Sequence, residues 1–375
     1  MPRDTASRSR LLLLIAGMTC FILTGALQGV MGPALPLFQS RFAIDTATAS
    51  WVLSSLGLGG FVSLVILYFL GPKVTPRMAL GLMALGAAGL ALAPGFPLLV
   101  TAALMFGLGF GSAAAMFNQR VLRAFGDRGA AMISLLNAAF SVGSISAPLA
   151  FLASGSRPEL VFGTVAVVAA LTLVIAEPAV PPASATSASP APGRPFRFHF
   201  PILAFGLIGI GIEVSLAGLG PTGLIRAGLT PEEASGLLSA HFLALLVGRL
   251  GLTWLAGRLG GFAIYTLAIL ATAFCGLGAA MVAPGPFFVA MGFFAGVFFP
   301  GYFVTAVAKM GDDPRVSPVI LATAQIGVVS VPLIVARLLP LMGDRGYFWL
   351  VAGAAGVVSL LALASYRRMS AVRSD

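Results

Sequence analysis

The sequence predicts an all-α integral membrane protein in which twelve transmembrane helices form two six-helix bundles. Of the 375 residues, 58% are hydrophobic and only 9% are charged, and the mean hydropathy is +1.01. An ordinary soluble domain carries about 25% charged residues, so this composition excludes a water-soluble protein. A helix that spans the bilayer needs about 20 apolar residues. The chain therefore has room for about twelve spans and for no large domain outside the membrane.

Apolar runs between charged, Pro and Gly residues mark the expected spans. One segment, 178–199, is too polar and too rich in Pro to span and predicts a flexible cytoplasmic linker. The expected organisation is thus an N-terminal bundle at 1–177, the linker, and a C-terminal bundle at 200–375. The spans are expected near 11–38, 48–70, 78–95, 97–118, 130–153, 159–177, 200–225, 234–256, 262–283, 285–308, 316–339 and 346–366.

The distribution of basic residues predicts the topology, because Lys and Arg concentrate in cytoplasmic loops. With the N-terminus inside, sixteen of the 22 Lys and Arg residues fall on the cytoplasmic side and five on the other, and Arg249 remains within a span. We therefore expect a multi-pass protein of the cell inner (plasma) membrane with both termini cytoplasmic. The basic residues form no single face, so no nucleic-acid partner is expected. Nothing in the sequence demands more than a monomer in the lipid bilayer.

Glu213 is the only one of the twelve acidic residues expected deep in a span. A carboxylate at the centre of a membrane helix costs about 2.5 to 3.5 kcal/mol, so it persists by facing a cavity, pairing or taking a proton. Its functional interpretation is a proton-coupling or substrate-binding site, and its structural interpretation is a buried hydrogen bond. His241, expected at a similar depth in the next span, could share the proton or bind a hydroxyl, or could only join two helices.

Side-chain amides supply further candidates for substrate binding. Gln28, Asn137 and Gln325 lie inside the first, fifth and eleventh expected spans, and Asn118 lies near the inner end of the fourth. Amides both donate and accept hydrogen bonds, which suits solute hydroxyls, but they also join membrane helices. Arg249, near the inner end of the eighth span, predicts either a gate or an anchor whose side chain reaches the interface.

The sequence contains no spacing typical of an enzyme or an ATP-driven pump. No His-Glu metal spacing, Ser-His-Asp set or Walker sequence occurs in it. We therefore expect no catalytic residues, no metal and no cofactor. Glu213 with His241 is the only pair at membrane depth that could serve an integral-membrane enzyme, which makes that function the least favoured.

Six spans, a central linker and six more spans resemble the major facilitator superfamily. Several stretches are similar to its fucose, galactose and glucose proton symporter branch. These stretches are GALQGVMGPALPLFQSRF from Gly25 with ATASW at 47–51, LLNAAFSVGSISAP at 135–148, GIEVSLAG at 211–218, VGRLGLTWLAGRLGG at 247–261 and AGVFFPGYF at 295–303.

The resemblance implies two bundles, in the major facilitator fold, that rock about a midplane cavity. It aligns Glu213 with a glutamate of many members' seventh span and Asn118 with an asparagine of their fourth. Arg258 belongs to a loop where members carry gating charges, although Gly257 stands where their acid would be. Family members carry an acidic residue in the first span and another in the fourth. In this chain the first of these positions aligns with Gly32 and the second falls near Ala114. Any proton would then be carried by Glu213 almost alone.

The leading prediction is a secondary active transporter that couples protons to symport of a sugar or another small polar solute by alternating access. One deep acid among amides and a His motivates it. A second hypothesis is a proton antiporter that exports hydrophobic drugs or metabolites, because 28 Phe and 13 Met could form an adaptable apolar cavity. A third is a non-transporting receptor or assembly factor on a transporter fold, since fold alone does not determine function.

Overall fold

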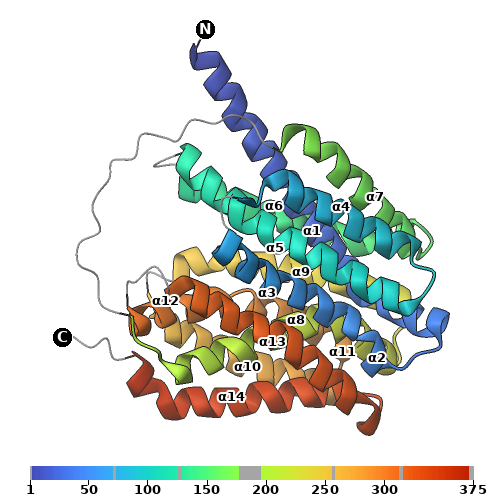
Figure 1. Cartoon of the computed structure of the whole chain (residues 1–375). Helices are drawn as coiled ribbons and strands as arrows, with labels where there is room; N and C mark the ends of the chain where they lie inside the picture. Colours follow the sequence, from blue (N-terminus) through green and yellow to red (C-terminus); the bar gives the residue numbers. More distant parts are fainter. Residues whose placement is uncertain are drawn as a thin grey trace. The chain divides into compact units, whose positions relative to one another are not determined.

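Every regular element that the computed structural model describes is a helix. The described residues are 2–70, 73–125, 129–176, 196–255, 258–311 and 316–370, so positions 178–195 of the expected linker lie outside them. Figure 1 shows the helices in chain order from blue to red. They are α1 (Pro2–Phe42), α2 (Thr46–Ala49), α3 (Trp51–Leu70), α4 (Pro76–Leu92), α5 (Phe96–Phe125), α6 (Gly129–Ala153), α7 (Pro158–Thr172), α8 (Phe200–Arg226), α9 (Pro231–Leu255), α10 (Gly261–Met281), α11 (Pro284–Ala295), α12 (Phe298–Met310), α13 (Val316–Leu338) and α14 (Gly346–Ser370), with 3-10 turns η3 (Leu173–Ile175) and η4 (Leu339–Leu341).

Most of these helices are built to cross a bilayer. In the described residues, eleven helical segments are long and apolar enough to span a membrane, and α4 is a shorter apolar helix of 17 residues. A membrane offers the backbone no water, so a helix that satisfies its own N–H and C=O groups is the element that can cross it. The expected all-helical membrane architecture is confirmed, while the count of exactly twelve spans stays a prediction.

Several expected spans differ in their bounds from the helices in the structure. The first helix is longer than the run at 11–38, because the polar residues before Leu11 extend it to Pro2. The run at 285–308 is divided between α11 and α12, although together they form one candidate span, Pro284–Met310. The cause lies in Pro300, the third residue of α12. A proline has no N–H to donate to the carbonyl four residues earlier, here that of Gly296, so the ladder is interrupted there.

The chain divides into two compact units. The first comprises Met1–Ala34, Ser40–Ala43 and Trp51–Ser189, and the second comprises Leu35–Gln39, Ile44–Ser50 and Pro190–Asp375. Within the first unit, α3 and α4 pack against α5, and α4 packs against α7. Within the second, α8 packs against α13, α10 against α14, and α9 against α11.

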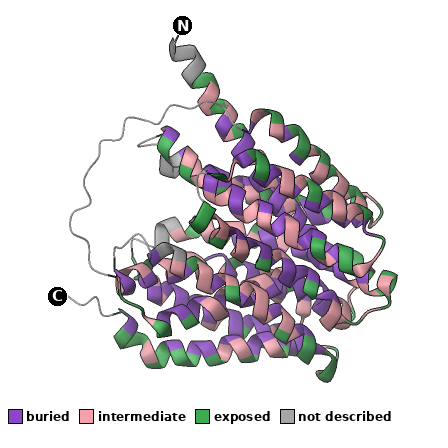
Figure 2. Ribbon diagram, in the orientation of Figure 1, coloured by how far each residue is buried: buried purple, intermediate pink, exposed green. Residues whose placement is uncertain are grey.

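The outer surface of the helices carries many large apolar side chains. Figure 2 shows buried, intermediate and exposed residues alternating along each helix. Many exposed positions carry large apolar side chains; Phe69 of α3, for example, is 75% exposed and Leu360 of α14 is 68% exposed. Such surfaces would be unfavourable in water and are suited to lipid. The hydrophobic effect therefore does not distinguish the core from the exterior here.

Close backbone contact at glycine residues, instead of the hydrophobic effect, brings neighbouring helices together. In the first unit, a Cβ atom at Gly25 of α1 would overlap the carbonyl oxygen of Phe140 on α6. In the second unit, a Cβ at Gly327 of α13 would overlap the carbonyl oxygen of Leu207 on α8, and one at Gly211 would lie 3.0 Å from the Gly327 oxygen. Small residues let membrane helices approach until their backbones are in contact. The contacts at Gly327 and Gly211 bring α8 and α13 close together.

One end of the second unit is organised around the start of α8. His199 is the N-cap of this helix, and its Nδ1 accepts a hydrogen bond from the backbone N–H of Ile202 at 3.3 Å. Burial, together with the positive charge of Lys309, lowers the pKa of His199 below its usual value. Lys309 in turn donates to the carbonyl oxygen of Arg368 at the end of α14, at 2.7 Å. The neutral form of His199 is the one that can accept the capping hydrogen bond.

We predict that Gly327→Ala destabilises the second unit. The added methyl group must push α13 away from the Leu207 carbonyl, and overpacking of this kind costs about 1 to 3 kcal/mol. Gly356→Ala on α14 is the matched control, because a Cβ there meets no atom within 4 Å. Thermal unfolding of the purified protein in detergent measures both. Equal melting temperatures for the two variants would contradict the proposed role of the glycine contact.

We predict that His199 makes stability depend on pH. The pKa of His199 is lower in the folded state than in the unfolded chain, where it is about 6.5. The stabilisation by neutral His199 is therefore complete above pH 6.5 and is lost as the pH falls below that value. His199→Asn keeps a capping oxygen that does not titrate, so its melting temperature should fall less than that of the unmodified protein between pH 7.5 and 5.5. A parallel decline in both proteins would refute this prediction.

Candidate functional site

Glu213 lies at the middle of α8, thirteen residues from Phe200, where that helix begins. The helix is held on both sides of this residue by tyrosine hydroxyls from other helices. Tyr265 of α10 donates to the carbonyl oxygen of Phe205 at 2.7 Å, and Tyr347 of α14 donates to that of Ser215 at 2.9 Å. With the glycine contact to α13, these bonds hold α8 on both sides of Glu213.

The partner of Glu213 is Arg249 of α9. Arg249 Nη2 donates to Glu213 Oε1 at 3.2 Å, which makes a salt bridge between two neighbouring helices of the second unit. The Arg249 side chain is 31% exposed and that of Glu213 is 16% exposed. Each charge alone would be costly among apolar helices, and the partner offsets that cost. The pair is largely enclosed, yet part of both side chains remains accessible.

The pair shows where the Arg249 side chain lies, which the sequence alone left open. Arg249 was expected to act as a gate or to reach the membrane interface, and the structure places its guanidinium on Glu213 instead of at a helix end. The sequence did contain a signal for this contact. Glu213 was the one acid expected deep in a span, and Arg249 was the one basic residue left inside a span. Two isolated charges of opposite sign on consecutive spans favour pairing, because neither is tolerated alone.

His241 has a different environment from the ion pair. Its side chain is fully buried, its Nδ1 lies 2.9 Å from the carbonyl oxygen of Phe288, and its ring stacks on the Phe288 ring at 4.6 Å. In the described residues, none of its hydrogen bonds or ring contacts involves Glu213. His241 precedes Arg249 by eight residues, a rise of about 12 Å along α9. The structure therefore does not bring His241 to Glu213.

The imidazole of His241 nevertheless keeps one unused atom. A neutral ring that donates from Nδ1 to the Phe288 carbonyl leaves Nε2 as an acceptor. This Nε2 atom is buried and has no hydrogen-bond partner among the described residues. Sequence reasoning did not identify Phe288, which orients the ring, because a backbone carbonyl on another helix leaves no mark in the sequence.

The amides are distributed over both units. Gln28 on α1, Asn118 on α5 and Asn137 on α6 belong to the first unit, and Gln325 on α13 belongs to the second. Asn137 is exposed and donates from Nδ2 to the carbonyl oxygen of Ile133 in its own helix, at 3.0 Å. Gln28 and Gln325 are half-buried. Asn118 has a buried Oδ1 with no hydrogen-bond partner in the described structure, so it retains an acceptor for a ligand.

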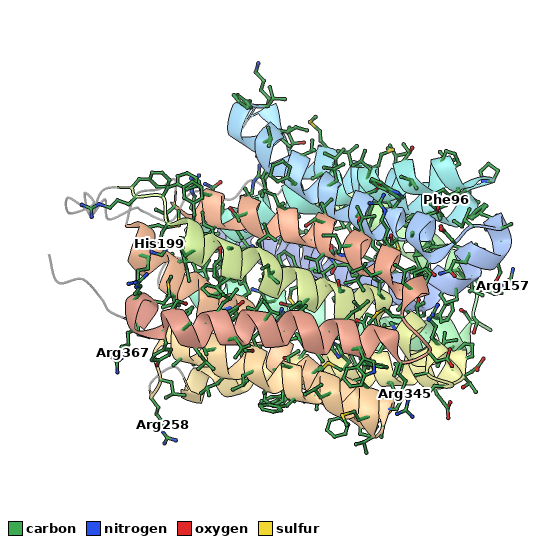
Figure 3. All side chains as sticks on the ribbon, turned by 90° about the horizontal axis from the view of Figure 1, so that it is seen from below. Phe96, Arg157, His199, Arg258, Arg345 and Arg367 are labelled. Carbon is green, nitrogen blue, oxygen red and sulfur yellow. The ribbon has the colours of Figure 1, made fainter. Side chains whose placement is uncertain are left out.

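The second expected gating residue, Arg258, lies just before α10 and is exposed. Figure 3 shows Arg258 at the same end of the second unit as His199 and Arg367, with Arg345 at the opposite end. The end that carries Arg258 is the one for which the distribution of basic residues predicts a cytoplasmic location. Arg258 is thus placed at a helix end and not with the Glu213–Arg249 pair.

We predict that the Glu213–Arg249 pair is coupled energetically. Glu213→Gln leaves the guanidinium without a counter-charge and should lower the free energy of unfolding by about 1 to 3 kcal/mol. The double variant Glu213→Gln with Arg249→Gln should recover part of that loss, because no charge is left unpaired. A double-mutant cycle of thermal unfolding in detergent measures the coupling.

The control is the exposed pair of the first unit. Arg41 Nη1 contacts Glu159 Oε1 at 3.0 Å, and the two side chains are 45% and 40% exposed. Exposed pairs contribute about 0 to 1 kcal/mol, so Glu159→Gln should have a small effect. Strictly additive effects of the two substitutions in the Glu213–Arg249 cycle would show that the contact contributes nothing.

Comparison with solved structures shows the fold. A mutant of the nucleoside transporter NupG superposes with a TM-score of 0.75 over 96% of this chain and 100% of its own, at 14% sequence identity. A POT family transporter in complex with 5-aminolevulinic acid has a TM-score of 0.76, with 97% of each chain covered and 13% identity. A D-xylose-proton symporter has a TM-score of 0.72, with 94% and 97% covered and 14% identity.

Comparison with sequences shows the family. No curated protein matches the chain, but the family model of the Major Facilitator Superfamily matches residues 17–317. This match spans most of the chain, including Glu213, Arg249 and all the helices from α3 to α12. Its members are transporters, which agrees with an all-helical chain whose exposed faces are apolar. The protein therefore belongs to the Major Facilitator Superfamily and is a multi-pass membrane transporter of small-molecule solutes.

Proposed function

We propose that this transporter is a symporter that couples the entry of protons to the uptake of a sugar or another small polar solute, with Glu213 as the proton-binding group. The observation that carries the proposal is the salt bridge between Glu213 and Arg249 in the middle of apolar helices. A carboxyl group in such surroundings can switch between an ionised, paired form and a neutral form. In a secondary transporter, a switch of this kind links proton binding to a change of conformation.

The architecture that we propose is that of the superfamily. Two six-helix bundles at 1–177 and 200–375, joined by a cytoplasmic linker, would alternate around a central site in the inner membrane, with both termini in the cytoplasm. Binding sites of such carriers lie near the midplane between repeated halves. Gln28, Asn118, Asn137, His241 and Gln325 are the proposed hydrogen-bonding groups for the solute, and Arg258 is a proposed gate residue. Two of them, Asn118 and His241, have an unpartnered buried atom.

The proposed cycle uses the two forms of Glu213. When ionised, Glu213 neutralises Arg249 and keeps α8 and α9 bridged. When a proton binds to a carboxylate oxygen, the carboxyl group becomes a neutral hydrogen-bond donor and no longer holds the guanidinium by charge. The two helices are then free to separate or to accept solute between them. A proton gradient can drive accumulation because the protonated and ionised forms favour different states.

The solutes named for two of the similar structures are also polar. A nucleoside transporter and a D-xylose-proton symporter share this fold, and their solutes carry several hydroxyl groups. Their low sequence identity bears on the fold alone, so the solute class of this chain is assigned from its own residues. A single carboxyl group at depth, with amides on other helices, is suited to a polar solute.

The test is uptake into proteoliposomes that contain the purified protein. Labelled neutral sugars, nucleosides and sugar acids are offered with and without an inward proton gradient. We predict that Glu213→Gln abolishes accumulation driven by the gradient, because glutamine binds no proton, while exchange of solute across the membrane continues in part. Glu232→Gln, in the exposed first turn of α9, is the control and should accumulate solute normally. Full accumulation by Glu213→Gln would rule out Glu213 as the proton-binding group.

A further inference from the structure

The charges around Glu213 and Arg249 balance within the pair itself. Helix α8 packs against α9, α11, α12, α13 and α14. On the described parts of these elements the remaining ionisable side chains are neutral groups within the helices or charged groups near their ends. They are the neutral His241, Tyr302, Tyr347 and Tyr366, and the terminal Arg226, Glu232, Glu233, Lys309, Arg337, Arg367 and Arg368.

Protonation of Glu213 would disturb this balance. An arginine side chain stays protonated under all conditions relevant to a protein. When the Glu213 carboxyl group is neutral, the Arg249 guanidinium is therefore an unpaired cation among apolar helices. An unpaired charge at such a position is more costly than the original pair. A neutral solute, such as a sugar, supplies no charge that could restore the balance.

A carboxylate on the solute is the group that best restores the charge balance beside Arg249. A guanidinium offers five N–H donors in a planar fork that matches the two oxygens of a carboxylate, and Glu213 Oε1 already accepts from one of them, at Nη2. The Arg249 side chain is also 31% exposed, so the protein does not cover it completely. A solute carboxylate on Arg249 would reproduce the contact that Glu213 makes in the empty carrier.

We propose that the solute of this transporter is a small monocarboxylate, whose carboxylate replaces that of Glu213 on Arg249 when Glu213 takes up a proton. The empty carrier holds one ionised Glu213 and one Arg249. The loaded carrier holds neutral Glu213, Arg249 and the bound anion, so both have the same net charge at the site. One proton and one anion then cross together, and the step moves no net charge. This inference rests on the proposed function and specifies its solute.

The residues beside the pair favour a solute with few hydroxyl groups. Within four positions of Glu213 on α8 and of Arg249 on α9, the neighbours are apolar residues or glycine, apart from Ser215 and Thr253. A polyhydroxylated sugar needs several donors and acceptors near its ring. A single carboxylate on a compact body needs only the guanidinium, and the apolar neighbours suit the remainder of such a molecule.

The first experiment measures binding in detergent by thermal unfolding. The Glu213→Gln variant imitates the protonated carrier, so its Arg249 should bind lactate, and its melting temperature should rise in a saturable way with lactate concentration. Potassium chloride at equal ionic strength controls for screening. The Glu213→Gln, Arg249→Gln double variant should show no rise. An equal response of the single and double variants to lactate would overturn the proposal.

The second experiment measures transport by the unmodified protein, so it does not depend on a variant that folds. Glucuronate and glucose share a sugar ring, but only glucuronate carries a carboxylate. Lactate represents a small monocarboxylate. Protein-free liposomes are the control for lactate uptake. Under an inward proton gradient, we expect accumulation of lactate, approaching tenfold for each unit of pH difference. Its rate should be the same with and without an inside-negative potential set by potassium and valinomycin, because no net charge moves. Glucuronate should be preferred to glucose.

Two results separate the failure of this inference from the failure of the proposed function. Accumulation of glucose but not lactate, faster at an inside-negative potential, would overturn the carboxylate solute and leave proton symport standing. Uptake of lactate that does not depend on the proton gradient would overturn proton coupling.

Arg249→Gln should lose lactate uptake, whereas Arg337→Gln, at the exposed end of α13, should retain it. Normal lactate uptake by Arg249→Gln would also refute the inference.

Discussion

The absence of water around the helices is the constraint on which the rest of this structure depends. Because lipid cannot hydrogen-bond to the backbone, every described span satisfies its own N–H and C=O groups as a helix. Because lipid is as apolar as the core, burial of side chains cannot drive the helices together. Packing then depends on close backbone contact, which Gly327 permits against Leu207 and Gly25 permits against Phe140. The same constraint makes every isolated charge costly.

The Glu213–Arg249 pair follows from that cost. Neither side chain would be stable alone at this depth, and their contact at 3.2 Å brings the site close to neutrality. A site that is neutral only as a pair is sensitive to a proton, because neutralising the acid leaves the base unpaired. In the transport cycle that we propose, proton binding and anion binding are linked by charge balance at this one place. This linkage is a property of the two side chains and requires no distant communication between sites.

Much of the fold could be predicted from residue patterns. Apolar runs of about 20 residues located most of the helices, since length and hydropathy are what the bilayer selects. The patterns were less reliable where local backbone chemistry decides, because Pro300 divides one expected span into α11 and α12. That Glu213 is a charged residue deep in a span could be inferred from its position along the chain. The environment of His241 could not be inferred from the sequence, because the Phe288 carbonyl that contacts its ring lies on another helix.

The sequence by itself determined that this chain lies in a membrane, that it is helical, and that Glu213 and Arg249 are charges inside its spans. These are properties of composition and of position along the chain, and the bilayer acts on them locally. Only the tertiary structure decided that the two charges meet, and that His241 turns to Phe288 and Asn137 to its own helix. Contacts of this kind depend on the rotation and spacing of neighbouring helices. Those are determined by glycine contacts and tyrosine hydrogen bonds between segments far apart in the sequence.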